Sequence, residues 1–364
     1  MKQKYNFYKR NGKIELLRFL FAVIIVLHHS RQLLGDENCL FLGGSLGVEF
    51  FFIVSGYLMM SSIEKRKCVR GGDNCVIGKE TLHFLFKKIK SILPEAFVSW
   101  TIAFAFVVAV TPIDGIKGII KKFIDGVWEF LILKMSGLST GGVNGVVWYI
   151  SSMLLCMAVL YPLIRRYSDV MLRIIIPLSM VVIFGWLCQE YGSPRNPSEW
   201  VGFTYKGNVR AFAEIELGIL CYWVVARLKT YSFTNIGRCI ITFIETTSYI
   251  LVVLYMYTEE ASKRDYFFIM LIAFGVICSF SEIGYLSHFF DSSFSYFLGK
   301  FSVPLYFSHV FYAGNLNKIL PNEFTGIERM TVYLCCSFIT AGIVMIFSKQ
   351  IRKNILNWRK LLIK

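Results

Sequence analysis

Two neighbouring stretches, IELLRFLFAVIIVLHHS (residues 14–30) and GGSLGVEFFFIVSGYLMM (residues 43–60), decide the fold of this chain. Each is an apolar run close to the length that crosses a bilayer, about 20 residues. Similar runs recur throughout the 364 residues, which are 55% hydrophobic and only 17% charged. Soluble domains usually carry about 25% charged residues. We therefore predict a polytopic membrane protein whose partners include the lipid bilayer.

Ten apolar ranges predict an all-α bundle of about ten transmembrane helices, forming a single membrane-embedded domain over residues 1–364. The range 115–135 mixes apolar residues with lysines and acids, which is typical of an amphipathic helix in the membrane interface. Lysine and arginine concentrate in alternate loops, so we predict that both termini are cytoplasmic and that the chain crosses the inner or plasma membrane. The predicted spans are residues 14–34, 42–62, 91–111, 144–164, 171–190, 209–227, 236–257, 266–284, 294–314 and 329–349.

The formal net charge of +15 does not by itself predict a nucleic-acid partner. The basic residues lie in short loops between apolar runs, as the positive-inside rule expects of a membrane protein. The ten cysteines form no CxxC pair and no Cys/His cluster with zinc spacing. We therefore expect no nucleic acid, no metal and no bound cofactor, while the oligomeric state stays open.

Ionisable residues inside a predicted span are costly and by default indicate function. Arg18 and His29 are eleven residues apart. They therefore share one helix face, with a rise of about 16 Å between them. Glu15 precedes Arg18 by one turn. Either Glu15 and Arg18 mark the cytoplasmic boundary and His29 the outer one, or His29 is a general base in a polar cavity and Arg18 binds an anionic group.

Other predicted spans also carry polar residues. Glu49 and Ser55 lie among glycines and aromatics of the second span, where Glu49 needs a partner or a water-filled cavity. The glycines there favour close helix packing. Arg210 and Glu214 form an i,i+4 pair on the sixth span, either a structural ion pair or part of a site. Trp148 opens the fourth span as an interfacial aromatic residue or as a ligand contact.

Near the C-terminus, Ser302, Tyr306 and His309 follow one another at i, i+4 and i+7 and share a helix face. Pro304 cannot donate a backbone hydrogen bond, so we predict a helix that begins at Ser302 as its N-cap, with Pro304 in the first turn. A break at membrane depth requires protein or water around it and favours a polar pocket. The alternative interpretation is that Tyr306 and His309 are interfacial belt residues.

Taken in this order, the motifs resemble the acyltransferase 3 family of integral membrane proteins, which includes O-acetyltransferases of lipopolysaccharide O-antigen, capsule and Nod factors. Arg18 and His29 occupy the family's Arg and His positions, and GVEFFFIVSG (residues 47–56) is similar to its Gly-Val-x-x-Phe-Phe-x-x-Ser-Gly signature. FLFKKIKSILP (residues 84–94) resembles its basic stretch before the third span, with lysines where arginines are usual. Further similarities lie at Trp148, at Arg210 and Gly218, and in LGKFSVPLYFSH (residues 298–309).

The resemblance implies an O-acyltransferase, in particular an O-acetyltransferase, that moves an acyl group from acetyl-CoA or another acyl-CoA to a hydroxyl group of a surface or exported glycan. The predicted catalytic residues are His29 as the general base, Arg18, which binds the phosphates of acyl-CoA, and Glu15, which orients Arg18. Transfer is either direct or goes through an acyl-enzyme intermediate. A transporter or flippase of glycolipid or polysaccharide precursors is the second interpretation, because polar groups at membrane depth also suit a transport pathway. The residues that the resemblance assigns to acyl-CoA or acceptor binding are Ser55, Lys88, Lys90, Trp148, Arg210, Ser302, Tyr306 and His309.

Overall fold

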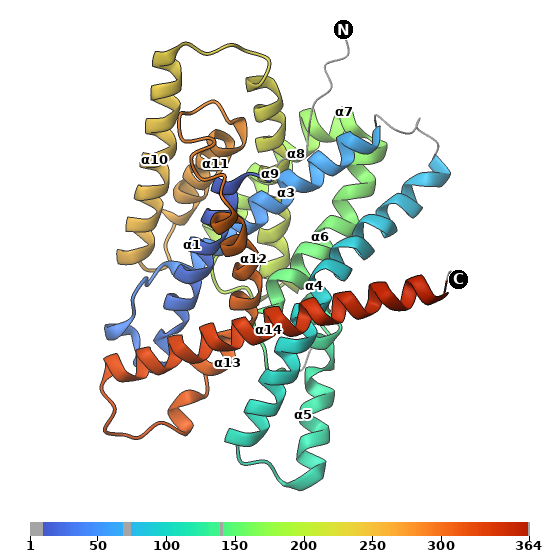
Figure 1. The fold of residues 1–364 in the computed structure, drawn as a ribbon. Coiled ribbons are helices and arrows are strands. Elements are labelled where there is room, and N and C mark those ends of the chain that lie inside the picture. The colour runs from blue at the N-terminus through green and yellow to red at the C-terminus, as the bar shows by residue number, and fades with distance from the viewer. Residues whose placement is uncertain (1–9, 68–73, 139–140, 363–364) are drawn as a thin grey trace.

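The computed structural model describes residues 10–67, 74–138 and 141–362, and most of these residues are helical (Figure 1). The strands within the described residues are β1 (Trp200–Val201) and β2 (Thr204–Tyr205), which form one antiparallel pair. Six helices in the described ranges are long and apolar enough to cross a membrane. The chain is therefore an all-α, multi-pass membrane protein, as the sequence predicts.

A helix lies at each of the ten ranges predicted to span the membrane, and short helices connect several of them. Short 3-10 turns cover Asp36–Asn38, Gly44–Leu46, Lys134–Ser136 and Leu316–Lys318, and a π-helical turn covers Met171–Ile175. The α-helices are α1 (Gly12–His29), α2 (Arg31–Leu34), α3 (Gly47–Lys67), α4 (Asn74–Val110), α5 (Gly115–Phe130), α6 (Val147–Arg166), α7 (Ser168–Val170), α8 (Ile176–Tyr191), α9 (Lys206–Leu228), α10 (Asn235–Thr258), α11 (Asp265–Ser281), α12 (Ser293–Ser308), α13 (Val310–Ala313) and α14 (Gly326–Leu362).

The six helical segments that meet the length and hydropathy of a membrane span are α3, α4, α6, α7 with α8, α10 and α14. The remaining four predicted spans correspond to α1, α9, α11 and α12. Of these, α11 and α12 have 17 and 16 residues, whereas α1 and α9 carry several charged side chains. The count of ten spans and the cytoplasmic location of both termini therefore remain predictions.

The stretch before the third predicted span is helical and not a loop. The sequence predicts a basic loop over residues 63–90, of which residues 68–73 lie outside the described part of the chain. Instead α3 continues to Lys67 and α4 begins at Asn74, so α4 has 37 residues and contains Pro94 in its interior. Apolar residues recur at helical spacing among the lysines before Pro94, and this pattern supports a helix even though its mean hydropathy is low.

α1 and α12 lie side by side and run in the same direction. At their first turns, the backbone N–H of Gly12 donates to Oδ1 of Asp291 at 2.9 Å. At their last turns, the rings of His29 and His309 meet edge to face, with centroids 4.9 Å apart. The two helices therefore end at the same level, and each presents a histidine there.

α3 and α9 cross in direct backbone contact because a glycine stands on each helix. A Cβ atom at Gly56 would lie 2.1 Å from the carbonyl oxygen of Ile215, and one at Gly218 would lie 2.0 Å from that of Ile53. No side chain fits at either position, which confirms the close packing predicted for the glycines of the second span.

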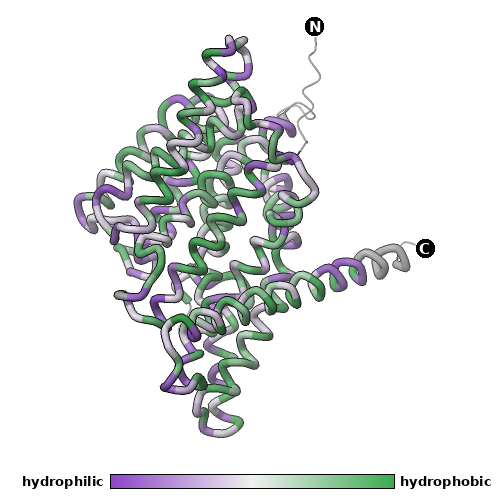
Figure 2. Tube along the Cα trace, turned by 60° about the vertical axis from the view of Figure 1, so that its left-hand side comes forward, coloured by the Kyte–Doolittle hydropathy of each residue, from purple (hydrophilic) through white to green (hydrophobic). Residues whose placement is uncertain are grey.

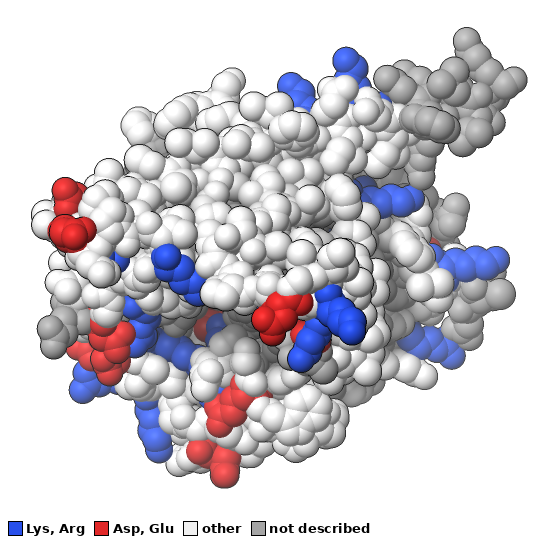
Figure 3. Space-filling view, turned by 90° about the horizontal axis from the view of Figure 1, so that it is seen from below, with Lys and Arg blue, Asp and Glu red and all other residues white. Residues whose placement is uncertain are grey.

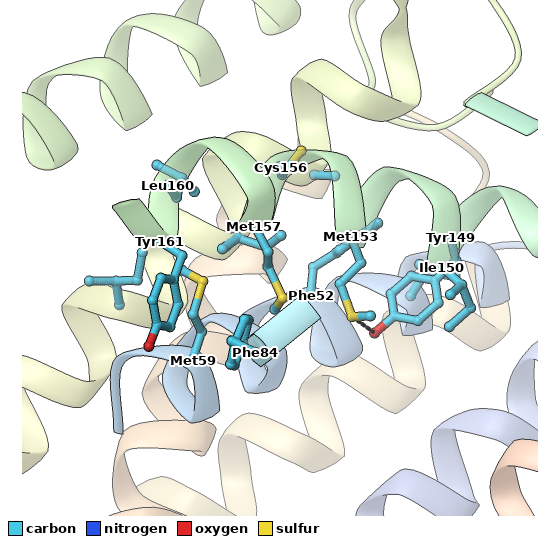
Figure 4. Close-up of a cluster of buried hydrophobic side chains, with 14 of the residues drawn as sticks. Phe52, Met59, Phe84, Tyr149, Ile150, Met153, Cys156, Met157, Leu160 and Tyr161 are labelled. Carbon is cyan, nitrogen blue, oxygen red and sulfur yellow. Dashed lines mark hydrogen bonds between the residues drawn. The ribbon is translucent and has the colours of Figure 1, made fainter. Parts of the chain in front are cut away.

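Aromatic and sulfur-containing side chains fill the core between α3, α4 and α6 (Figure 4). Phe84 of α4 stacks on Tyr161 of α6, and Phe52 of α3 packs against Tyr149 of α6, with ring centroids 4.6 Å apart in each pair. The Tyr149 hydroxyl donates a weak hydrogen bond to the sulfur of Met153 at 3.8 Å. This packing holds Tyr149 at a fixed position inside the bundle.

Apolar side chains cover wide parts of the outer surface (Figure 2). On α8 and α10, for example, Leu178 is 61% exposed and Phe243 is 70% exposed. Seen from below, a broad uncharged area adjoins a region where acidic and basic side chains gather (Figure 3). Soluble monomers rarely expose apolar patches larger than a few hundred Å², so lipid tails are expected to cover this surface.

α5 occupies the range predicted to form an amphipathic helix. Its exposed side chains include the apolar Ile116, Ile120 and Phe123 as well as lysines. Glu129, near its C-terminal end, is only 1% exposed. The helix therefore keeps one carboxylate inside the protein, and its location in the membrane interface stays a prediction.

Candidate functional site

A cavity of about 870 Å³ is lined by side chains from α1, α3, α4, α6, α12 and α14. Binding sites for small molecules usually measure about 300–1,000 Å³. The cavity is therefore large enough for a sizeable ligand. It brings together five of the residues singled out in the sequence, namely Arg18, Ser55, Lys88, Ser302 and Tyr306.

One region of this cavity is strongly basic. Glu95 is the single carboxylate among its described lining residues, and Arg352 binds it, with Nη1 and Oε1 2.6 Å apart. The remaining positive charge suits an anionic ligand, above all one with phosphate groups. The cationic lining residues are Arg10, Arg18, Lys88, Lys300, Lys349 and Arg352.

Glu15 orients two of these cations. Its Oε1 accepts a hydrogen bond from Nη2 of Arg10 at 2.8 Å, and its Oε2 accepts one from Nη1 of Arg18 at 3.2 Å. The contact between Glu15 and Arg18 that the sequence predicts is thus present. Glu15 packs against Gly299 of α12, where an added Cβ atom would lie 2.0 Å from Oε2.

We expect Gly299→Ala to destabilise the protein by about 1–3 kcal/mol, because the new methyl group displaces the Glu15 carboxylate from its arginines. Gly185→Ala in α8 is the matched control, since its Cβ atom would have no neighbour within 4 Å among the described residues. Alanine favours a helix over glycine there. Chemical unfolding in detergent measures both variants, and equal free energies of unfolding would contradict the prediction.

Two hydroxyl groups of α12 also line the cavity. Ser302 donates to the carbonyl oxygen of Gly299 at 2.9 Å, and Tyr306 donates to that of Val146 at 3.1 Å. Both hydroxyl hydrogens are therefore used by the backbone, and the oxygens remain able to accept a hydrogen bond from a ligand.

A second pair of hydroxyl groups lines the same part of the cavity. Ser55 of α3 and Tyr149 of α6 form a mutual hydrogen bond of 3.2 Å. Two hydroxyls carry two hydrogens, and their mutual bond uses only one. The second is available to a ligand, since its other nearby acceptor is the weak Met153 sulfur. The sequence analysis names Trp148 as a candidate ligand contact. Its neighbour Tyr149 lines the cavity instead.

The hydrogen bonds of His29 determine which nitrogen can act as a base. Its Nδ1 lies 2.8 Å from the carbonyl oxygen of Ile25. A carbonyl can only accept, so Nδ1 carries the hydrogen and the lone pair of the neutral ring is on Nε2. Within the described part of the chain, no side chain or backbone group bonds this Nε2. The half-buried ring therefore presents a free basic nitrogen.

His309 connects His29 to the cavity. Its Nε2 lies 3.4 Å from Nδ1 of His29, and its Nδ1 lies 3.3 Å from the carbonyl oxygen of Leu305. On its other side, its ring centroid is 5.9 Å from that of Tyr306, a lining residue. His29 itself is not among the residues that line this cavity. The two histidines therefore stand directly beyond the Tyr306 side of the cavity.

The helix break predicted at Ser302 lies elsewhere. α12 is continuous from Ser293 to Ser308 and contains Pro304 in its interior. Ser292 is its N-cap and accepts a hydrogen bond from the backbone N–H of Ser295 at 3.1 Å. The hydroxyl of Ser302 donates to a carbonyl and caps no N–H. The break falls at His309, which separates α12 from α13.

Arg210 and Trp148 lie outside this cavity, in a buried ionic cluster. Arg210 donates through Nη2 to Glu49 and through Nη1 to the carbonyl oxygen of Pro194, and its Nε is 3.4 Å from Glu214. The guanidinium also lies over the Trp148 ring, 5.2 Å from its centroid. All three charged residues of the cluster are at most 1% exposed. The predicted Arg210–Glu214 pair is present, and Glu49 adds a second carboxylate.

Lys90 is exposed and does not line the cavity, in contrast to Lys88 on the same helix. The sequence interpretation also missed several lining residues. Cations near the ends of predicted spans cannot be told from ordinary positive-inside residues in a single sequence. The missed cations are Arg10, Lys300, Lys349 and Arg352.

A family model described as an acyltransferase domain, that of the acyltransferase 3 family, matches residues 11–349 of the chain. The match includes the histidine pair, the buried ionic cluster and all lining residues of the cavity except Arg10 and Arg352. No curated protein and no solved structure matches the chain. The chain therefore belongs to the acyltransferase 3 family and is a membrane acyltransferase.

Proposed function

We propose that this protein is an O-acyltransferase of the cell membrane that moves an acyl group, in particular acetyl, from acyl-CoA to a hydroxyl group of a surface or exported glycan. The observation that carries the proposal is one cavity that joins six cationic side chains to the hydroxyl groups of Ser55, Tyr149, Ser302 and Tyr306 and adjoins a histidine pair. Acyl-CoA has the matching chemistry, with phosphates at one end and a thioester at the other. The basic region would bind the phosphates, and the thioester would extend toward Tyr306.

In this mechanism His29 is the general base. Its Nε2 takes the proton of the acceptor hydroxyl while that oxygen attacks the thioester carbonyl. The new C–O bond forms as the C–S bond breaks, and the proton passes from His29 to the departing thiolate of CoA. α1 and α12 both end at the histidine pair, and helix C-termini stabilise positive charge.

The hydroxyl groups of the cavity would stabilise the oxyanion and bind the acceptor. The hydrogen that the Ser55–Tyr149 bond does not use has only the weak Met153 acceptor, so it would be able to turn to the oxyanion that develops on the thioester carbonyl. Ser302 and Tyr306 retain accepting oxygens and suit the hydroxyls of the incoming acceptor. With both termini in the cytoplasm, as the charge pattern predicts, the basic region faces the compartment that holds acyl-CoA.

Isolated membranes supplied with radiolabelled acetyl-CoA test this proposal. We expect them to transfer label to glycan as an ester that mild base removes. A transporter or flippase would move precursors without transferring label. Membranes that contain the folded protein and its native glycans but transfer no label would refute the proposed function.

Arg18→Gln and Lys88→Gln are each expected to raise KM for acetyl-CoA by about 10- to 100-fold. A hydrogen bond to a charged group contributes about 1.5–3 kcal/mol, and each substitution removes one such donor from the phosphates. Lys79→Gln is the control, because Lys79 is an exposed lysine of α4 outside the cavity lining. The proposed phosphate site would be wrong if all three variants had the same KM.

A further inference from the structure

The end of α12 is held by hydrogen bonds from two other segments. The last carbonyl groups of a helix lack partners within it. At this end, the carbonyl oxygen of Phe307 accepts from Ser99 Oγ at 2.7 Å and from Asn144 Nδ2 at 2.9 Å. Ser99 and Asn144 are completely buried, and Phe307 is 1% exposed. A buried carbonyl without a partner is costly, so these donors stabilise the place where α12 ends.

Asn144 is in turn held by Glu129 of α5. The backbone N–H groups of Val143 and Asn144 both donate to Oε2 of Glu129 at 2.8 Å. Lys134 donates to the other carboxylate oxygen at 2.6 Å. The chain passes so close that a Cβ atom at Gly142 would lie 2.0 Å from this carboxylate. Glu129 therefore fixes the backbone from which the Asn144 side chain reaches Phe307.

The same segment also binds the residue before Phe307. Tyr306 donates its hydroxyl hydrogen to the carbonyl oxygen of Val146. Two consecutive residues of α12 are thus attached to residues 144–146. His309 follows two residues later, and its Nε2 is the atom that meets Nδ1 of His29. A shift of the α12 end would move the His309 ring away from this contact.

We propose that Asn144 and Ser99 are positioning residues that hold the end of α12, and that His309 transmits this placement to His29. The inference rests on the proposed function, because it assigns His29 as the base. Neither Asn144 nor Ser99 lines the cavity. They therefore act on the rate through His309 and not through a contact with acyl-CoA.

The test compares Ser99→Ala, Asn144→Ala and the double variant in membranes that contain native acceptor glycan, with radiolabelled acetyl-CoA as donor. One donor still satisfies Phe307 in each single variant, so kcat should fall only about threefold. The double variant leaves the carbonyl unpaired and should lose about 100-fold, well beyond the product of the two single effects. KM for acetyl-CoA should stay within about twofold of wild type, because the phosphate-binding cations are untouched.

Thr101→Ala is the matched control, since Thr101 is an exposed hydroxyl residue of α4 that bonds Phe97 of its own helix at 2.9 Å. Rates are expressed per folded protein, measured by size-exclusion chromatography. The inference would be overturned if the kcat loss of the double variant equalled the product of the two single losses. A KM for acetyl-CoA that rises as kcat falls would also overturn it. If the double variant does not fold, the kcat of Ser99→Ala tests the inference. A value equal to that of Thr101→Ala would overturn the inference. Wild-type membranes without any transfer would refute the proposed function instead.

Discussion

Replacing His29 with alanine is expected to lower kcat for acyl transfer by about 10²- to 10⁴-fold, the usual contribution of a general base. The variant should still fold, because His29 is half-buried and its side chain bonds only the Ile25 carbonyl and the His309 ring in the described structure. KM for acetyl-CoA should change little, since the cations that suit its phosphates are elsewhere. Initial rates with radiolabelled acetyl-CoA in isolated membranes measure both quantities.

His29→Asn separates the base from the hydrogen bond that orients it. The asparagine amide can still donate to the Ile25 carbonyl, but it has no basic nitrogen in the place of Nε2. We expect the same loss of kcat as with alanine. His83→Ala, which removes an exposed histidine of α4, should behave as wild type. Transfer at the wild-type rate by His29→Asn would exclude His29 as the base.

Arg210→Leu is expected to destabilise the protein by about 3–5 kcal/mol, the largest effect on stability that we predict. The substitution leaves Glu49 and Glu214 buried without the cation that binds them. Their desolvation is then uncompensated. The loss should appear as a lower free energy of unfolding in detergent and as less folded protein in the membrane.

Removing all three charges together provides the sharper comparison. A variant with leucine at Glu49, Arg210 and Glu214 has no buried charge in this cluster, so it should be more stable than Arg210→Leu alone. Arg173→Leu is the control, because the Arg173–Asp169 pair is exposed and should contribute less than about 1 kcal/mol. If Arg210→Leu cost no more than Arg173→Leu, the cluster would not stabilise the fold.

Some structural features could not be located from local patterns. Ser302 has the spacing of an N-cap before proline, yet Ser292 caps the helix and α12 passes through Pro304 without ending. The basic stretch before Pro94 has the composition of a loop, yet it is helical because its apolar residues fit the packing of α4. In both cases tertiary packing outweighs a local signal of moderate strength.

The sequence alone determined that this chain is a helical membrane protein, to which family it belongs, and that Arg18 and His29 share a helix face. Each of these conclusions depends on apolar length or residue spacing within a short segment. Only the tertiary structure decided that Arg210 bonds Glu49, 161 residues away, and that His29 meets His309, 280 residues away. Such pairs depend on how closely two helices approach and in which register they pack. Here that is set by glycine contacts such as Gly56 with Ile215, which local periodicity does not encode.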